Sequence, residues 1–86
     1  MNHKADAVFV PLNIAVLTVS DTRTLETDTS GQLLVDRLTA AGHQLAARVL
    51  LKDDLYKIRA QVATWIAEDQ VQVVLITGGT GFSGRD

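Results

Sequence analysis

Three apolar runs alternate with two stretches of helical periodicity, and this order constrains the fold more than any other feature of the chain. The runs cover residues 14–19, 44–51 and 71–76. The first is continuously apolar and rich in β-branched residues, which is typical of a strand buried on both faces. Strands that alternate with helices pair in parallel through right-handed crossovers. The sequence therefore predicts an α/β domain with the order β-α-β-α-β.

The first helix is predicted to begin near residue 28 and to end before Gly42. Thr29 followed by Gln32 fits a capping box, and Asp28 is a competing N-cap. Gly42 is a natural C-terminal stop, and we expect His43 beside it to face solvent. The apolar positions at helical spacing are Leu34, Leu38 and Ala41.

The second helix is predicted to follow an N-cap at Asp54 and to reach about Glu68. Its apolar residues recur at intervals of three and four, which places them on one stripe of a helix. Trp65 lies on this stripe, and we expect it in the core. The stripe consists of Leu55, Ile58, Val62, Trp65 and Ile66.

Composition excludes several classes of protein. The net charge of −2 over 86 residues leaves no basic patch for nucleic acid. No apolar run reaches the roughly 18–20 residues needed to cross a bilayer, and the first residues lack the apolar segment of a signal peptide. We therefore expect a cytoplasmic protein with no nucleic-acid or membrane partner.

The two ends of the chain differ in what the sequence predicts for them. Residues 1–12 are expected to form an extended arm, since Pro11 disfavours a helix. Residues 13–86 then form the N-terminal part of a single domain, because the chain stops in a glycine-rich loop that normally leads into a further helix. We expect a parent chain of roughly 150–200 residues.

Each predicted strand ends in a polar or glycine-rich loop. These loops are Ser20-Asp21, Lys52-Asp53-Asp54 and the segment 77–81. Ligands of open parallel sheets bind at the carboxyl ends of the strands. The topology therefore predicts that three distant segments meet at one edge and form a site there.

The third of these loops is the strongest single motif. Its sequence, Thr77-Gly78-Gly79-Thr80-Gly81, allows a sharp turn whose N–H groups can bind an anion. Arg85 adds a guanidinium for an anionic ligand. A tight turn without a ligand is the alternative interpretation. Residues 79–84 also match G-x-G-x-x-G, but that fingerprint belongs after a first strand. A Walker A loop is disfavoured because Arg85-Asp86 replaces Lys-Ser/Thr.

The aspartates in these loops are candidates for metal chemistry. Asp28 and Asp54 singly are most simply N-caps. Asp53 is different, because Asp54 already serves as the cap and a second adjacent carboxylate favours a cation. Mg²⁺ typically takes one or two carboxylates together with substrate phosphates.

Three of these segments together resemble one family. The segments 17–21, 28–31 and 75–81 occur in this order and at similar spacing in the MoaB/MogA family of molybdenum cofactor biosynthesis proteins. The resemblance covers residues from about 12 to 86. It implies a three-layer α/β/α domain with a mostly parallel sheet that binds molybdopterin, usually as a homotrimer or homohexamer working with other proteins of the cofactor pathway.

The resemblance also implies an activity. Active members transfer AMP from Mg-ATP to the terminal phosphate of molybdopterin and release pyrophosphate. Asp53 and Asp86 match the acidic positions that catalytic members need, and either could hold Mg²⁺. Substrate contacts are implied at Ser20, Asp21, Asp28, Ser30, Gly31, Thr77, Gly78, Gly79, Thr80, Gly81 and Arg85.

Two alternatives remain open. Some members keep the fold without all of the acidic residues and bind without transferring, so a non-catalytic molybdopterin-binding or assembly protein is the first alternative. A NAD(P)-binding oxidoreductase, based on the glycine motif alone, is the remote one.

Overall fold

Five elements follow one another in the order that the sequence predicts. The computed structural model describes residues 8–78. Within this range no helix is long and apolar enough to cross a membrane. The elements are β1 (Asn13–Val19), α2 (Thr29–Ala40), β2 (Gln44–Leu51), α3 (Leu55–Ala67) and β3 (Val73–Gly78).

The three strands form one parallel sheet with β1 in the middle, in the order β2-β1-β3. Val16 pairs with Arg48 of β2 on one side and with Leu75 of β3 on the other. The β1–β2 pairing starts at Asn13 with Gln44 and has a register irregularity between Ile14 and Ala15. The central position of β1 explains why its sequence is continuously apolar, and the prediction of a parallel α/β sheet is confirmed.

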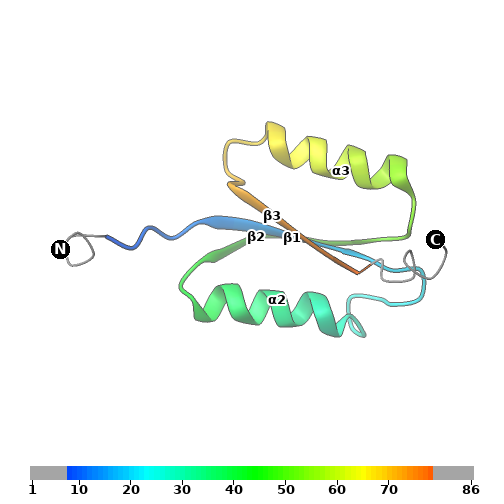
Figure 1. Ribbon diagram of the computed structural model, residues 1–86, viewed down its shortest axis with the longest axis horizontal. Helices are drawn as coiled ribbons and strands as arrows, with labels where there is room; N and C mark the ends of the chain where they lie inside the picture. Colours follow the sequence, from blue (N-terminus) through cyan, green and yellow to red (C-terminus); the bar gives the residue numbers. More distant parts are fainter. Residues whose placement is uncertain (1–7, 79–86) are drawn as a thin grey trace, which may run out of the picture.

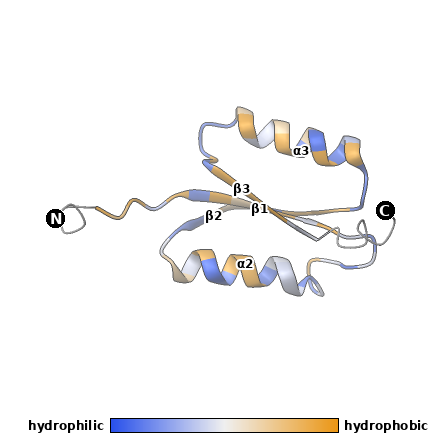
Figure 2. Ribbon diagram, in the orientation of Figure 1, coloured by the Kyte–Doolittle hydropathy of each residue, from blue (hydrophilic) through white to orange (hydrophobic). Residues whose placement is uncertain are grey.

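The helices cover opposite faces of the sheet and make a three-layer sandwich (Figure 1). Alternate residues of β1 serve the two faces. Leu17 packs in a cluster with Trp65 of α3, whereas Val16 packs with Leu38 of α2. Figure 2 shows hydrophobic colouring along the central strands and alternating bands on both helices. The core therefore consists of two apolar layers that share one strand.

The start of α2 corrects one prediction. Asp28, not Thr29, is the N-cap, and its carboxylate accepts a hydrogen bond from Gly31 N at 2.9 Å. Thr29 is the first helical residue, so the predicted capping box from Thr29 is wrong. A carboxylate is the stronger acceptor for the exposed N–H groups of a first turn. The end of α2 is as predicted, because Gly42 has a φ of 93° that favours glycine.

His43 is not the solvent-facing residue that the sequence suggests. It is half-buried, and its Nδ1 accepts a hydrogen bond from Leu12 N at 3.0 Å. Its ring also contacts Phe9, with 5.2 Å between the ring centroids. The prediction fails because the partners of His43 come from a segment about thirty residues earlier in the chain.

The cap of α3 is confirmed, but its apolar stripe is narrower than predicted. Asp54 accepts hydrogen bonds from Tyr56 N at 3.0 Å and Lys57 N at 3.2 Å. Trp65 is buried, whereas Leu55 and Ile66 are 62% and 75% exposed. At 3.6 residues per turn both lie about 80–100° around the helix from Trp65. They therefore flank the contact face and do not enter it.

The third strand is displaced by two residues from its predicted range of 71–76. It runs from Val73 to Gly78, so Thr77 and Gly78 belong to the strand and not to the following loop. Their partners on β1 are Thr18 and Val19, and this pairing extends the strand beyond its apolar run. The boundary depends on the register of β3 against β1, which the sequence of the third run alone does not encode.

Candidate functional site

Two of the three predicted segments contact each other at the carboxyl edge of the sheet. Ser20 N donates a hydrogen bond to Leu51 O at 2.9 Å, which continues the β1–β2 pairing past the end of β1. Asp53 N donates to Asp21 Oδ1 at 3.0 Å. The loops after β1 and β2 are thus joined by an aspartate from each, although 32 residues separate the two.

Ser20 shapes the loop that carries Asp21. Its Oγ accepts hydrogen bonds from Thr22 N at 3.3 Å and from Arg23 N at 3.0 Å. A serine that bonds to the backbone two and three residues ahead fixes a tight turn. The hydroxyl of Ser20, which was predicted to contact substrate, therefore stabilises the loop through these hydrogen bonds.

Gly78 brings the third segment against β1. Its φ is 96°, and a Cβ at this position would collide with the carbonyl oxygen of Val19. Only glycine fits so close an approach. The predicted site residues beyond it, Gly79, Thr80, Gly81, Arg85 and Asp86, lie outside the described residues.

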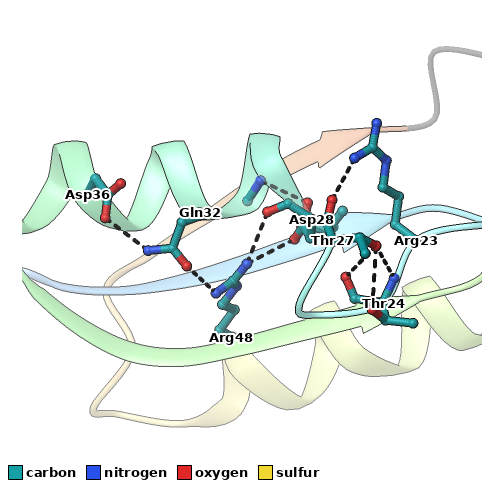
Figure 3. A network of polar contacts seen from close by, with 9 residues as sticks. Arg23, Thr24, Thr27, Asp28, Gln32, Asp36 and Arg48 are labelled. Carbon is teal, nitrogen blue, oxygen red and sulfur yellow. Dashed lines mark hydrogen bonds and ion pairs between the residues drawn. The ribbon is translucent and has the colours of Figure 1, made fainter.

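Asp28 is the most heavily engaged of the predicted site residues. It is 2% exposed, and Thr18 Oγ1 donates to its Oδ2 at 2.6 Å. Arg48 Nη2 lies 3.3 Å from the same oxygen and forms an ion pair with it (Figure 3). Gly31 N occupies the other oxygen, Oδ1. Both carboxylate oxygens thus have protein partners, so the geometry favours a structural role for this side chain.

The electrostatic balance at Asp28 keeps the carboxyl group ionised. Burial has the largest single influence and raises its pKa. The hydrogen bonds from Thr18, Gly31 and Arg48, together with the guanidinium charge, act in the opposite direction and leave the pKa below its usual value.

In the first turn of α2, Gly31 is buried against neighbouring side chains and Ser30 is exposed to solvent. A Cβ on Gly31 would collide with the carboxylate of Asp28 and the hydroxyl of Thr18, so a larger residue there would force these side chains to move. Of the predicted contacts on this turn, Ser30 is therefore the side chain that a ligand can reach.

Arg48 is the participant that the sequence analysis missed. Its Nη1 donates to Gln32 Oε1 at 2.8 Å and its Nη2 to Asp28 O at 3.3 Å. Gln32 Nε2 in turn donates to Asp36 Oδ1 at 2.9 Å, so the network runs along one side of α2 (Figure 3). A single charged residue inside the apolar run 44–51 was the available signal, since a buried charge needs a partner.

The donor set of the edge is compatible with Mg²⁺ without forming a complete site. The carboxylates of Asp21 and Asp53 come from adjoining loops, and hard oxygen ligands suit this cation. The carboxylate of Asp54 is engaged in capping α3. Over residues 8–78 no three acidic, histidine or cysteine residues are grouped to hold a metal. The described residues therefore offer Asp21 and Asp53 as candidate ligands and do not form a metal site by themselves.

The fold and the edge together define a parallel α/β/α domain with a candidate ligand site at the carboxyl ends of its strands. Residues 15–86 match the family model described as "Probable molybdopterin binding domain". The chain therefore belongs to this molybdopterin-binding domain family, to which the MoaB/MogA resemblance pointed.

Individual relatives agree with the family. The chain is 54% identical over 78 residues to molybdenum cofactor biosynthesis protein B of Escherichia coli strain K12, covering 91% of this chain and 46% of that protein. It is 42% identical over 84 residues to the protein of the same name from Bacillus subtilis strain 168, covering 98% and 49%.

A solved structure shows the same fold. The crystal structure of a molybdenum cofactor biosynthesis protein B superimposes with a TM-score of 0.81 at 43% identity, over 90% of this chain and 48% of that one. The chain thus spans about half the length of the relatives it matches.

Proposed function

We propose that this chain supplies part of the substrate site of a molybdopterin adenylyltransferase in molybdenum cofactor biosynthesis. On this proposal the loops after β1, β2 and β3 bind molybdopterin and Mg-ATP, and Asp53 is a catalytic residue. Family membership and the names of the relatives support the pathway and the pterin ligand.

The hydrogen bond from Asp53 N to Asp21 Oδ1 carries the proposal. It joins two acidic loops at the edge where the glycine segment of β3 also ends. Binding a pterin phosphate and a nucleotide triphosphate together requires both anion contacts and a means of holding a cation. Backbone N–H groups beyond Gly78 would supply the former and the carboxylates the latter.

The reaction needs little from the protein beyond positioning and charge neutralisation. A phosphate oxygen of molybdopterin attacks the α-phosphorus of ATP, and the bond from that phosphorus to the bridging oxygen of pyrophosphate breaks. When bound, Mg²⁺ would supply neutralisation of the charge that develops on the phosphates. Asp53, with Asp86 in the proposed complete site, would orient the cation, and a phosphate nucleophile requires no general base.

The proposal extends to assembly. A homotrimer or homohexamer would bury apolar surface that residues 8–78 leave exposed. Residues 13–86 would be the N-terminal part of its single domain, after the arm 1–12. The exposed apolar side chains on α3 and β3 include Leu55, Tyr56, Ile66 and Ile76.

The test is AMP transfer by the purified protein with molybdopterin and Mg-ATP. Asp53→Asn removes the charge at the proposed site. Asp69→Asn is the matched control, since Asp69 is exposed in the loop between α3 and β3, at the opposite end of the sheet. We expect pyrophosphate release that depends on molybdopterin, that Asp53→Asn abolishes and that Asp69→Asn leaves unchanged.

Other outcomes assign the chain differently. Molybdopterin binding without transfer by the wild type would establish the non-catalytic binding or assembly protein. Neither binding nor transfer would contradict the proposal as a whole. Nothing observed favours the nicotinamide alternative, because the glycine motif follows the third strand, β3, and not the first.

A further inference from the structure

One carboxylate joins three elements at the start of α2. Asp28 receives Thr18 from β1, Gly31 N from α2 itself and Arg48 from β2. Thr18, Asp28 and Arg48 are named here the Asp28 clamp. Arg48 is the member that reaches furthest, because it also binds the carbonyl oxygen of Asp28 and the side chain of Gln32 (Figure 3).

The Asp28 clamp and the hydrophobic core contact different parts of α2. Leu38 is the buried apolar anchor of the helix, about 15 Å along the axis from Asp28, and the half-buried Leu34 and Val35 pack against the same cluster. The core contact therefore fixes the middle and end of α2 on the sheet. The position of its first turn, which carries the exposed Ser30, depends on the clamp.

The side chains of the clamp are also tightly packed against α2. Gly31 lies so close to Asp28 and Thr18 that even a methyl group has no room. Arg48 is largely buried, with 18% of its side chain exposed, and its Nε is buried without a partner in the described structure.

We propose that Arg48 is a positioning residue for molybdopterin: by gripping Asp28 and Gln32 it sets the first turn of α2 against the carboxyl edge of the sheet. This inference rests on the proposed function and adds to it a residue that does not contact the ligand. Loss of Arg48 should therefore weaken molybdopterin binding, while the contact of Leu38 with the sheet preserves the fold.

The experiment measures molybdopterin dissociation constants by equilibrium dialysis, well below the melting temperature of each variant. Arg48→Met keeps the side-chain length without the charge, and Arg48→Lys keeps the charge without the two-sided grip. Arg59→Met is the matched control, since Arg59 is exposed on α3. Circular dichroism confirms that each variant is folded.

We expect Arg48→Met to weaken binding about tenfold or more, because small displacements of binding groups have large effects. Arg48→Lys should fall between it and the wild type, and Arg59→Met should match the wild type. In AMP transfer the loss should appear in KM for molybdopterin, with kcat at saturation nearly unchanged.

A folded Arg48→Met or Arg48→Lys with a lower melting temperature but an unchanged dissociation constant overturns the inference, since Arg48 is then only structural. If Arg48→Met does not fold, Arg48→Lys decides by the same criterion. If the wild type itself does not bind molybdopterin, the proposed function fails and the positioning role with it. These two failures are distinguished by the wild-type measurement alone.

Discussion

Both helices begin at an aspartate N-cap, yet the two aspartates have different surroundings. Asp28 is 2% exposed and bound by β1, β2 and its own helix. Asp54 is only half-buried and accepts hydrogen bonds from Tyr56 N and Lys57 N of its own helix. The same residue type at the same local position therefore joins three elements in one case and serves one helix in the other.

The two helix starts engage their carboxylates with different numbers of structural elements. At α2 the carboxylate of Asp28 accepts hydrogen bonds from protein donors on both oxygens, so it fixes the first turn of the helix in place. At α3 the cap leaves its neighbour, Asp53, at the edge beside Asp21. Of these two adjacent aspartates, Asp54 caps α3, and Asp53 is the one that we propose for the ligand site.

Removing the carboxylate at α2 should have the largest effect. Asp28→Ala leaves the mostly buried guanidinium of Arg48 without its counter-charge, and breaking one side of such a pair costs about 3–5 kcal/mol. Urea unfolding followed by circular dichroism measures this loss. A cost below about 1 kcal/mol would mean that Asp28 is no more than an ordinary cap.

Filling the space beside the clamp should rank second. Gly31→Ala forces a methyl group against Asp28 and Thr18, and such overpacking costs about 1–3 kcal/mol. Combining it with Thr18→Ser tests the mechanism, because the smaller side chain gives the hydroxyl freedom to move. If Gly31→Ala lost the same unfolding free energy with threonine as with serine at position 18, the collision would not be the cause of the loss.

The cap at α3 should matter less. Asp54→Ala removes acceptors for two backbone N–H groups, which costs about 1 kcal/mol. Asp54→Ser keeps an acceptor and should recover most of the loss in the same urea titration. If Asp54→Ala proved as damaging as Asp28→Ala, the contrast between the two helix starts would be wrong.

The smallest effect is a pH dependence confined to α2. The pKa of Asp28 is lowered in the folded protein, so its stabilisation is complete above the usual carboxyl range and is lost as the pH falls through the folded pKa. The difference in unfolding free energy between wild type and Asp28→Asn should be constant from about pH 5 to 8 and shrink below about pH 4.

Glu26 also has a lowered pKa, through its own backbone N–H and then Thr24. It is present in both proteins of that comparison, so its contribution cancels. A difference that grows as the pH falls would show that Asp28 is not stabilised as the carboxylate.

Periodic features of the sequence were enough to predict the five elements, their order and the parallel sheet. Contacts between distant segments were not predictable in the same way. By sequence, either Thr29 or Asp28 could be the N-cap of α2. In the structure Asp28 is the N-cap, and it is stabilised there by Thr18 and Arg48. The end of β3 at Gly78 depends on its pairing with β1, and the burial of His43 depends on Leu12 and Phe9.

The candidate site was predictable to the extent that topology defines it. Placing the strand ends at one edge brought Asp21 and Asp53 together as expected. Arg48 was missed because its partner lies twenty residues away, in a loop whose position only the folded chain reveals.

The central claim, that Asp28 holds the structure and Asp53 serves the chemistry, is tested most directly by comparing Asp28→Asn and Asp53→Asn. Unfolding free energy and AMP transfer should be measured on both variants. The account predicts that Asp28→Asn loses stability and that Asp53→Asn keeps it within about 0.5 kcal/mol, as expected for a site outside the core, while losing transfer. Full transfer by Asp53→Asn, or a stability loss equal to that of Asp28→Asn, would contradict it.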